Sequence, residues 1–450
     1  MQISQYHKNV ILFILKIQAK YLLPESTVRD LIDDIMELQS DVISLSKQSI
    51  INVFENEKFS DSILSSVLAA FPNDSLFTAF NIMKSKRLQR NYLNENLNLV
   101  EPVQYNLKLN NKISNYQYVP ILRSIQAFCK NNEVLDYIMS MPTEGQVNIL
   151  SDICDGKIFK NNEIFQTFPN IQILLYFDEF VVSNPLRGNQ AKHKLAAFYY
   201  TLANIPIKYR SRVKDMQLAI LCKSCDLKYF GFQAILKPLI EDIKILETEG
   251  IVISDIPCKV KGSIVSVIGD NLAANQIGGY VTCFSGNAHC CRFCTASIND
   301  MQLQFRDSFF VQRTKQMHNQ HLSLVNIDSK YVSAYGLKFE SPLNSLNFFH
   351  TSAMLPPDIM HDLFEGVVPF ELGLIINNLI SKNYITLSQL NYKIKYSKFG
   401  FHDNENRPTE LSDNFTKGIK MISSRIWCFL RFLPLLIGNY VPESEPVWHL

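Results

Sequence analysis

The 450-residue sequence lacks a strong charge of either sign, since 44 Lys and Arg stand against 42 Asp and Glu for a net charge of +2. Overall basic charge therefore cannot drive nucleic-acid binding, and any DNA affinity must come from local basic patches. The sequence also shows no targeting peptide, internal repeat or low-complexity block. Its apolar runs Val10–Leu15 and Phe429–Ile437 are too short or interrupted to span a bilayer, so we expect no membrane partner.

What is present suits a folded chain, because hydrophobic residues make up 47% and charged residues 19%. The length predicts two or three domains. Of the ten cysteines, four crowd between Cys283 and Cys294. In a chain without a signal peptide this crowding indicates a metal site rather than a disulfide framework.

The pattern of apolar residues predicts a mixed α/β fold in three parts. Residues 1–165 look mainly helical, with a linker at Asn91–Lys112. Residues 166–380 alternate strands and helices, and residues 381–450 look helical. We predict strands at Ile171–Phe177, Leu195–Leu202, Met216–Cys222 and Ser263–Ile268, a helix at Phe232–Leu246, and a long helix from Pro356 to about Ile380.

Three acidic residues follow these predicted elements in an order that suits phosphodiester cleavage. Asp178 ends the first strand, Asp270 ends the fourth, and Glu365 lies on the long helix. Two divalent ions about 3.5–4 Å apart neutralise the attacking and leaving oxygens, and carboxylates are their natural ligands. Asp358, His361, Asp362 and Glu365 share one helical stripe. Glu179 is a rival of Asp178, and Asp362 is a rival of Glu365.

Three longer motifs surround these acids. They are DEFVVSNPL from Asp178 with KHKL from Lys192, GDNLA from Gly269 with the trailing C-x-x-C, and LPPDIMHDLFEGV from Leu355. Together they resemble the eukaryotic CACTA/EnSpm-like transposases of animal genomes. The resemblance covers roughly residues 115–450. It implies an RNase H-like catalytic core over residues 166–380, with Asp178, Asp270 and Glu365 binding Mg²⁺ or Mn²⁺. It also implies transposon-end DNA as the partner and a nuclear location, while leaving a homo-oligomer open.

The sequence departs from the resemblance in two ways. The N-terminal zinc fingers common among relatives are not found, and the chain stops at Leu450 where relatives continue. These departures favour a truncated or domesticated copy. Two alternatives to an active transposase therefore stay open: a catalytically silent descendant that binds DNA or protein, and a zinc-stabilised scaffold. Without the transposase function, a cytoplasmic location is the default.

The cysteine cluster predicts a zinc site within an insertion spanning residues 283–350. Cys291 and Cys294 have zinc-knuckle spacing, and Cys283, His289 and Cys290 lie close by. The remaining ligands stay open, with His318, His321 and His361 as candidates. For a second C-x-x-C, Cys222 and Cys225, we favour reduced cysteines without metal.

Basic residues gather in two places where this fold would meet DNA phosphates. The first patch is Arg187, Lys192, His193 and Lys194, and the second is Lys208, Arg210, Arg212 and Lys214. A solvated turn explains each patch equally well. A third group is Lys84, Lys86, Arg87 and Arg90, which forms a weak match to a nuclear import signal or a solvated helix face.

Overall fold

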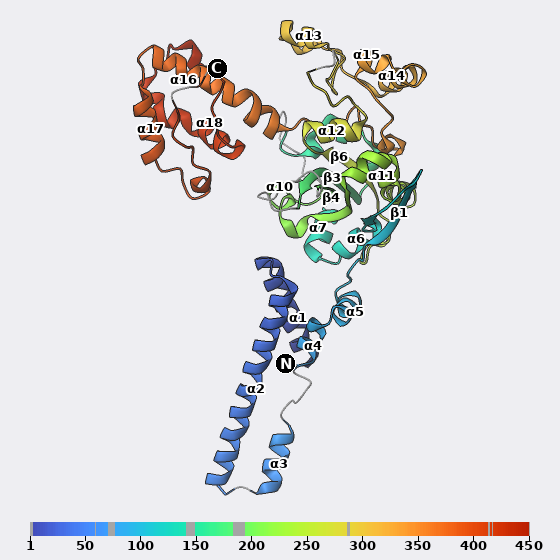
Figure 1. The fold of residues 1–450 in the computed structure, drawn as a ribbon, viewed down its shortest axis with the longest axis vertical. Coiled ribbons are helices and arrows are strands. Elements are labelled where there is room, and N and C mark those ends of the chain that lie inside the picture. Colours follow the sequence, from blue (N-terminus) through green and yellow to red (C-terminus); the bar gives the residue numbers. More distant parts are fainter. Residues whose placement is uncertain are drawn as a thin grey trace. The chain divides into compact units, whose positions relative to one another are not determined.

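The computed structural model describes residues 3–58, 60–70, 77–140, 149–182, 194–285, 289–412, 415 and 417–449. The chain divides into one unit of residues 1–100 and another of residues 101–450 (Figure 1). The first unit contains helices α1 Ile3–Tyr21, α2 Glu25–Asn56, α3 Asp61–Ala69, α4 Thr78–Lys84 and α5 Lys86–Asn96. Its small core includes Ile11, Ile14, Ile32 and Phe80. The predicted helical region, residues 1–165, extends beyond this unit and also contains two strands, Val103–Leu109 and Lys112–Tyr118.

The second unit contains a six-stranded mixed sheet in the order β1-β2-β5-β4-β3-β6. The strands are β1 Val103–Leu109, β2 Lys112–Tyr118, β3 Asn170–Val181, β4 Lys194–Leu202, β5 Gln217–Lys223 and β6 Lys261–Ile268. Neighbouring strands are antiparallel except β3 and β6, which are parallel. The four predicted strands are confirmed as β3, β4, β5 and β6, because each is a short apolar run bounded by turn residues.

The α-helices of the second unit are α6 Ile121–Phe128, α7 Asn132–Met139, α8 Lys157–Lys160, α9 Glu163–Gln166, α10 Ile207–Arg210, α11 Ser224–Thr248, α12 Asn271–Gly278, α13 Ile298–Leu303, α14 Lys315–Ile327, α15 Tyr331–Tyr335, α16 Val368–Ser381, α17 Leu387–Tyr396 and α18 Ser423–Ile437. A π-helix, η7 Met360–Val367, leads directly into α16. The predicted long helix after Pro356 is thus present, but its first turns have π rather than α geometry.

The two faces of the sheet bury different residues of β3. Ile173, Leu175 and Phe177 belong to the main core, where the Phe177 ring meets Phe232 of α11 edge-on with centroids 5.4 Å apart. Leu174 belongs instead to a separate cluster with Phe159 and Phe165 from the segment of α8 and α9. Because side chains alternate along a strand, Asp178 shares the face of Leu174, and Glu179 shares the face of Phe177.

The boundary between the units differs from the predicted one near residue 165. The predicted linker Asn91–Lys112 contains the end of α5 and all of β1. Only Leu107 of β1 is buried, although the strand sequence VQYNLKL alternates apolar and polar residues throughout. This alternation is a strand signal that the linker prediction missed. Tyr118 of β2 pairs with Ile220 of β5, and this pairing joins the hairpin to the sheet.

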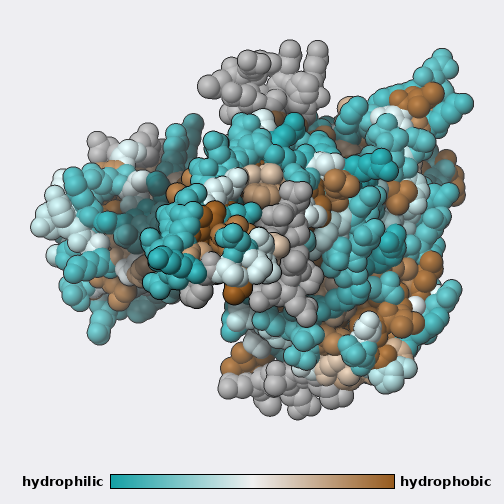
Figure 2. All heavy atoms as spheres, turned by 90° about the horizontal axis from the view of Figure 1, so that it is seen from below, coloured by the Kyte–Doolittle hydropathy of each residue, from teal (hydrophilic) through white to brown (hydrophobic). Residues whose placement is uncertain are grey.

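The C-terminal helices have a core of their own, which includes Leu372, Ile376, Leu390 and Phe429. By length and composition, the 22-residue helical stretch Met360–Ser381 is apolar enough to cross a membrane. Since Leu372, Ile376 and Leu379 pack in this core and a single such helix is weak support, we do not assign it to a membrane. On the face drawn in Figure 2, hydrophilic residues predominate and hydrophobic ones form small groups, as on ordinary protein surfaces.

Candidate acidic site and cysteine turn

The site begins where β3 and β6 run side by side. Tyr176 pairs with Ile268 in the parallel register, and Asp178 and Asp270 each lie two residues further along. The two acids therefore lie at the same end of adjacent parallel strands, as predicted. Asp178 is an exposed residue within β3 rather than the residue that ends it. It lies near Tyr199 of β4, whose pKa is raised first by burial and then by the charge of Asp178.

Glu179, the rival of Asp178, lies on the other face of the sheet. It lines a cavity of about 530 Å³ together with Leu227 and Phe232 of α11. Its carboxylate pairs with Lys194 at 2.8 Å. This position separates it from the face that carries Asp178, so Asp178 is the residue of this pair that can share a site with Asp270.

Asp270 caps the N-terminus of α12. Its Oδ1 accepts a hydrogen bond from the Ala273 N–H at 2.6 Å. Gly269 permits this turn to pack closely, since a Cβ there would lie 3.0 Å from the Phe177 carbonyl oxygen. A capping role accounts for one carboxylate oxygen of Asp270 and is compatible with metal binding by the other.

In the acidic stripe at the start of the long helix, His361 interacts with an acidic residue on either side of it in the sequence. Asp358 Oδ2 lies 2.5 Å from His361 Nδ1, and Glu365 Oε2 lies 3.9 Å from His361 Nε2. The hydrogen bond with Asp358 raises the pKa of His361, and the charges of Glu365 and Asp270 add to the shift.

Asn271 connects α12 directly to η7. Its Nδ2 donates to Asp362 Oδ1 at 2.5 Å, and its Oδ1 accepts from Arg292 Nη1 at 2.8 Å. Arg292 also donates to the Pro356 carbonyl at 2.8 Å and is 5% exposed. Burial lowers the pKa of Arg292, and the negative charge of Asp362 opposes that shift. Sequence reasoning assigned no role to Asn271 or Arg292, although both lie inside the motifs described above.

Glu365 makes a different contact from the one predicted for it. Its Oε1 accepts a hydrogen bond from Ser423 Oγ of α18 at 2.5 Å. Within the described part of the chain, no three His, Cys, Asp or Glu side chains gather closely enough to hold a metal ion. Asp178 and Asp270 are thus brought to one sheet end and Asp362 is tied to Asn271, while Glu365 is not joined to either strand acid by a contact.

The turn from Cys291 to Cys294 is held by hydrogen bonds around both cysteines. The Phe293 N–H donates to Cys291 Sγ at 3.4 Å. Arg313 Nε donates to the carbonyls of Cys291 and Cys294 at 3.0 Å each. Burial raises the pKa of Cys294, and the neighbouring Cys291 raises it further. The two cysteines therefore share one hydrogen-bonded turn, and zinc binding by them stays a prediction.

The three histidines offered as further zinc ligands have other surroundings. His318 is fully buried between Tyr280 and His350, and burial lowers its pKa to about 4. His321 stacks on Tyr335 with ring centroids 4.0 Å apart. His361 belongs to the acidic stripe. Nearer the turn, His289 Nδ1 lies 2.9 Å from the Thr295 carbonyl, which leaves Nε2 as its possible metal-binding atom.

The other C-x-x-C offers no paired site. Cys222 is buried in the main core, and burial raises the pKa of its thiol to about 12. Cys225 is exposed on α11. The two thiols therefore lie in different surroundings, and a pair without metal stays a prediction.

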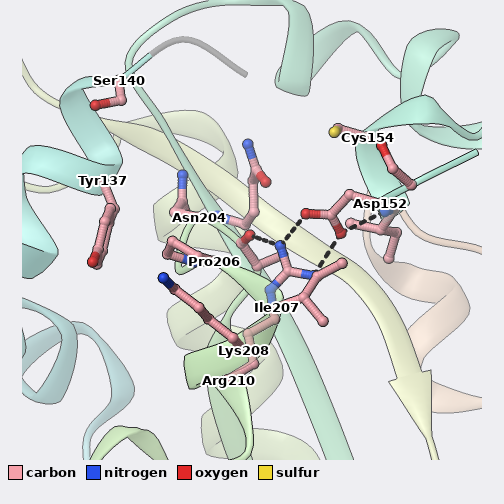
Figure 3. A pocket seen from close by; sticks show the side chains of 13 residues that line it. Tyr137, Ser140, Asp152, Cys154, Asn204, Pro206, Ile207, Lys208 and Arg210 are labelled. Atoms are coloured by element: carbon pink, nitrogen blue, oxygen red, sulfur yellow. Dashed lines mark hydrogen bonds and ion pairs between the residues drawn. The ribbon is translucent and has the colours of Figure 1, made fainter. Parts of the chain in front are cut away.

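The second predicted DNA-binding patch requires a correction at Arg210 (Figure 3). Its Nη1 and Nη2 donate to the Asp152 carboxylate at 2.6 and 2.7 Å. Its Nε donates to the Ile205 carbonyl at 2.6 Å. Arg210 and Asp152 line a cavity of about 510 Å³. Because its donors are committed to internal acceptors, Arg210 is a structural residue here and is not available to phosphates.

The remaining basic residues differ in how far they are engaged. Arg212 pairs with Asp215 at 2.5 Å and stacks over Tyr209, whereas Lys208 and Lys214 are exposed. Lys194 pairs with Glu179. Arg187, Lys192 and His193 lie outside the described residues. In the first unit, Lys84 pairs with Asp33, and Lys86 pairs with Glu25 at 2.9 Å.

Comparison with known proteins adds no assignment. No family model matches the chain, and no curated protein matches it.

Proposed function

We propose that this protein is a DDE-type transposase-like enzyme that cleaves DNA and transfers strands with the help of Mg²⁺ or Mn²⁺. The observation that carries the proposal is the parallel pairing of β3 and β6, whose register brings Asp178 and Asp270 to one end of the sheet. Two carboxylates from adjacent strands can share divalent ions, and such ions activate and stabilise the oxygens of a phosphodiester displacement.

We further infer an RNase H-like core. The order β5-β4-β3-β6 has three antiparallel strands followed by one strand parallel to β3, with α11 connecting β5 to β6. In such a core the first and fourth strands are neighbours and carry the first two acids. The β1–β2 hairpin extends the sheet beyond β5 and lies away from that pair.

Each acid has a distinct part in the proposed reaction. Asp178 and Asp270 would hold the ions, and bound ions would supply charge stabilisation for a displacement by water and then by a 3′ hydroxyl. Glu365 is the proposed third ligand, with Asp362 as its rival. The contact between Asp362 and Asn271 favours the rival in the geometry described, and Glu365 would have to leave Ser423 to reach the ions. Function in the nucleus, on transposon-end DNA, follows from this activity.

Nicking of supercoiled DNA in Mn²⁺ tests the proposal. Asp178→Asn and Asp270→Asn should each lower the rate by about two orders of magnitude or more, because each removes charge that stabilises the transition state. Glu179→Gln is the matched control and should cleave normally. Loss of cleavage in Asp362→Asn but not in Glu365→Gln would assign the third position to Asp362. Normal nicking by both strand variants would refute the proposal.

A second candidate is a catalytically silent descendant that binds DNA or protein through the same fold. It is favoured by the contact between Glu365 and Ser423, and by the lack of a three-residue metal-binding group among the described residues. This candidate predicts that the unmutated protein binds duplex DNA in Mn²⁺ without cutting it. Nicking that depends on Asp270 would exclude it.

A further inference from the structure

Basic and aromatic residues alternate where α17 ends and the following turn begins. The stretch 391–402 reads NYKIKYSKFGFH and contains no acidic residue. Ile394 and Phe399 are 1% and 3% exposed and fix the stretch to the C-terminal core. The residues between these anchors are thereby held on the outside.

The outward side chains include three aromatic rings that are largely exposed. Tyr392, Tyr396 and Phe401 are 64%, 63% and 92% exposed. The two tyrosine rings lie one turn apart on α17 with centroids separated by 4.6 Å. Gly400 has a φ of 80°, and nothing lies within 4 Å of a Cβ built there. The space beside the turn, next to Phe401, is therefore open. Leaving such rings in water costs free energy that a ligand could recover.

Lysine side chains lie beside these rings. Lys395 and Lys398 line a hollow of about 750 Å³ together with Tyr396 and Phe401. Lys398 is exposed, and Lys395 lies 5.8 Å from the centre of the Tyr396 ring and forms a long, exposed pair with Glu410 at 3.5 Å. Among nearby acids, Asp403 pairs with Arg431, while Glu405 lines the hollow. Cations that alternate with exposed rings match a chain of phosphates that alternate with flat bases.

We propose that Tyr392, Tyr396, Lys398 and Phe401 form a binding surface for unpaired nucleic acid, with bases stacked on the rings and phosphates near the lysines. A duplex fits less well, because its bases are already stacked on one another and cannot reach the rings. The surface is separate from the acidic site, so the proposal does not depend on cleavage there.

The proposal is tested by measuring the binding of a labelled oligothymidylate to the full chain by fluorescence anisotropy. A strand of about 20 nucleotides is long enough, because one single-strand binding site covers ~4–16 nucleotides. Phe401→Ala should weaken binding by about 5- to 150-fold, the effect of losing one base stack. Lys398→Ala should reduce the salt slope of log affinity by about 0.7, the contribution of one phosphate contact on a single strand.

Two controls match the variants in chemistry and exposure. Phe305 is 89% exposed, and Lys244 is exposed on α11, so Phe305→Ala and Lys244→Ala should leave binding unchanged. Three results would overturn the assignment. Phe401→Ala and Phe305→Ala could weaken binding equally, or a matched duplex could bind more tightly than the single strand. The third is self-association of the protein that disappears in Phe401→Ala.

Discussion

His361 is the residue through which pH should act on the acidic stripe. Asp358 raises its pKa above the usual range, aided by Glu365 and Asp270. The charged form of His361 should therefore stabilise the folded protein fully below the unfolded-state pKa of about 6.5. This stabilisation should be lost as the pH rises through the higher pKa that His361 has in the folded protein.

Titration of the His361 ring by NMR checks this sign. We expect a pKa above about 6.5 in the unmutated protein and a fall towards that value in Asp358→Asn, because the strongest hydrogen bond is then weakened. Asp328→Asn, distant in the sequence and paired with Lys330, is the control and should leave the titration unchanged. A His361 pKa below the usual value would contradict the described arrangement.

Arg210 should matter for stability rather than for DNA affinity. Its side chain is 13% exposed, and that of Asp152 is 25% exposed. Arg210→Ala should lower the free energy of unfolding by about 3 kcal/mol, because it leaves a partly buried carboxylate without its cation. The neighbouring Lys208→Ala should change stability by no more than about 0.5 kcal/mol. Urea unfolding measures both, and a fully stable Arg210→Ala protein with weaker DNA binding would restore the original DNA-binding prediction.

At the scale of elements, the cysteine turn should bind zinc. We predict that Cys291→Ser abolishes zinc binding by the purified protein, because a knuckle needs both thiolates. Cys225→Ser is the matched control from the other C-x-x-C and should retain the metal. His289→Ala should lower zinc occupancy more than His318→Ala, since the carbonyl of Thr295 orients the His289 ring. Metal analysis that finds no zinc in the unmutated protein would exclude the site.

The elements themselves were predictable where local sequence decides them. Short apolar runs predicted β3 to β6. The different signal of β1, the alternation of apolar and polar residues in VQYNLKL, was present in the sequence but was missed by the linker prediction. The π geometry of Met360–Val367 also has no local signal. Contacts from elsewhere in the chain, such as Asn271 to Asp362, set the positions of the stripe residues.

At the scale of the whole molecule, sequence spacing located the acids but not all of their neighbours. The parallel pairing that joins Asp178 to Asp270 was predictable from strand order and is confirmed. The pairing of Arg210 with Asp152, 58 residues away, and of Glu365 with Ser423, also 58 residues away, depends on tertiary structure. Such long-range contacts decide which charged residues are available for function, and one sequence alone does not reveal them.

The central claim is that Asp178 and Asp270 together hold a divalent ion. Mn²⁺ binding to the full chain, followed by electron paramagnetic resonance, tests it without requiring cleavage. We predict a bound Mn²⁺ signal that is lost in Asp178→Asn and in Asp270→Asn and retained in Glu179→Gln, because Glu179 lies on the other face of the sheet. Mn²⁺ binding of unchanged strength in both strand variants would contradict the account.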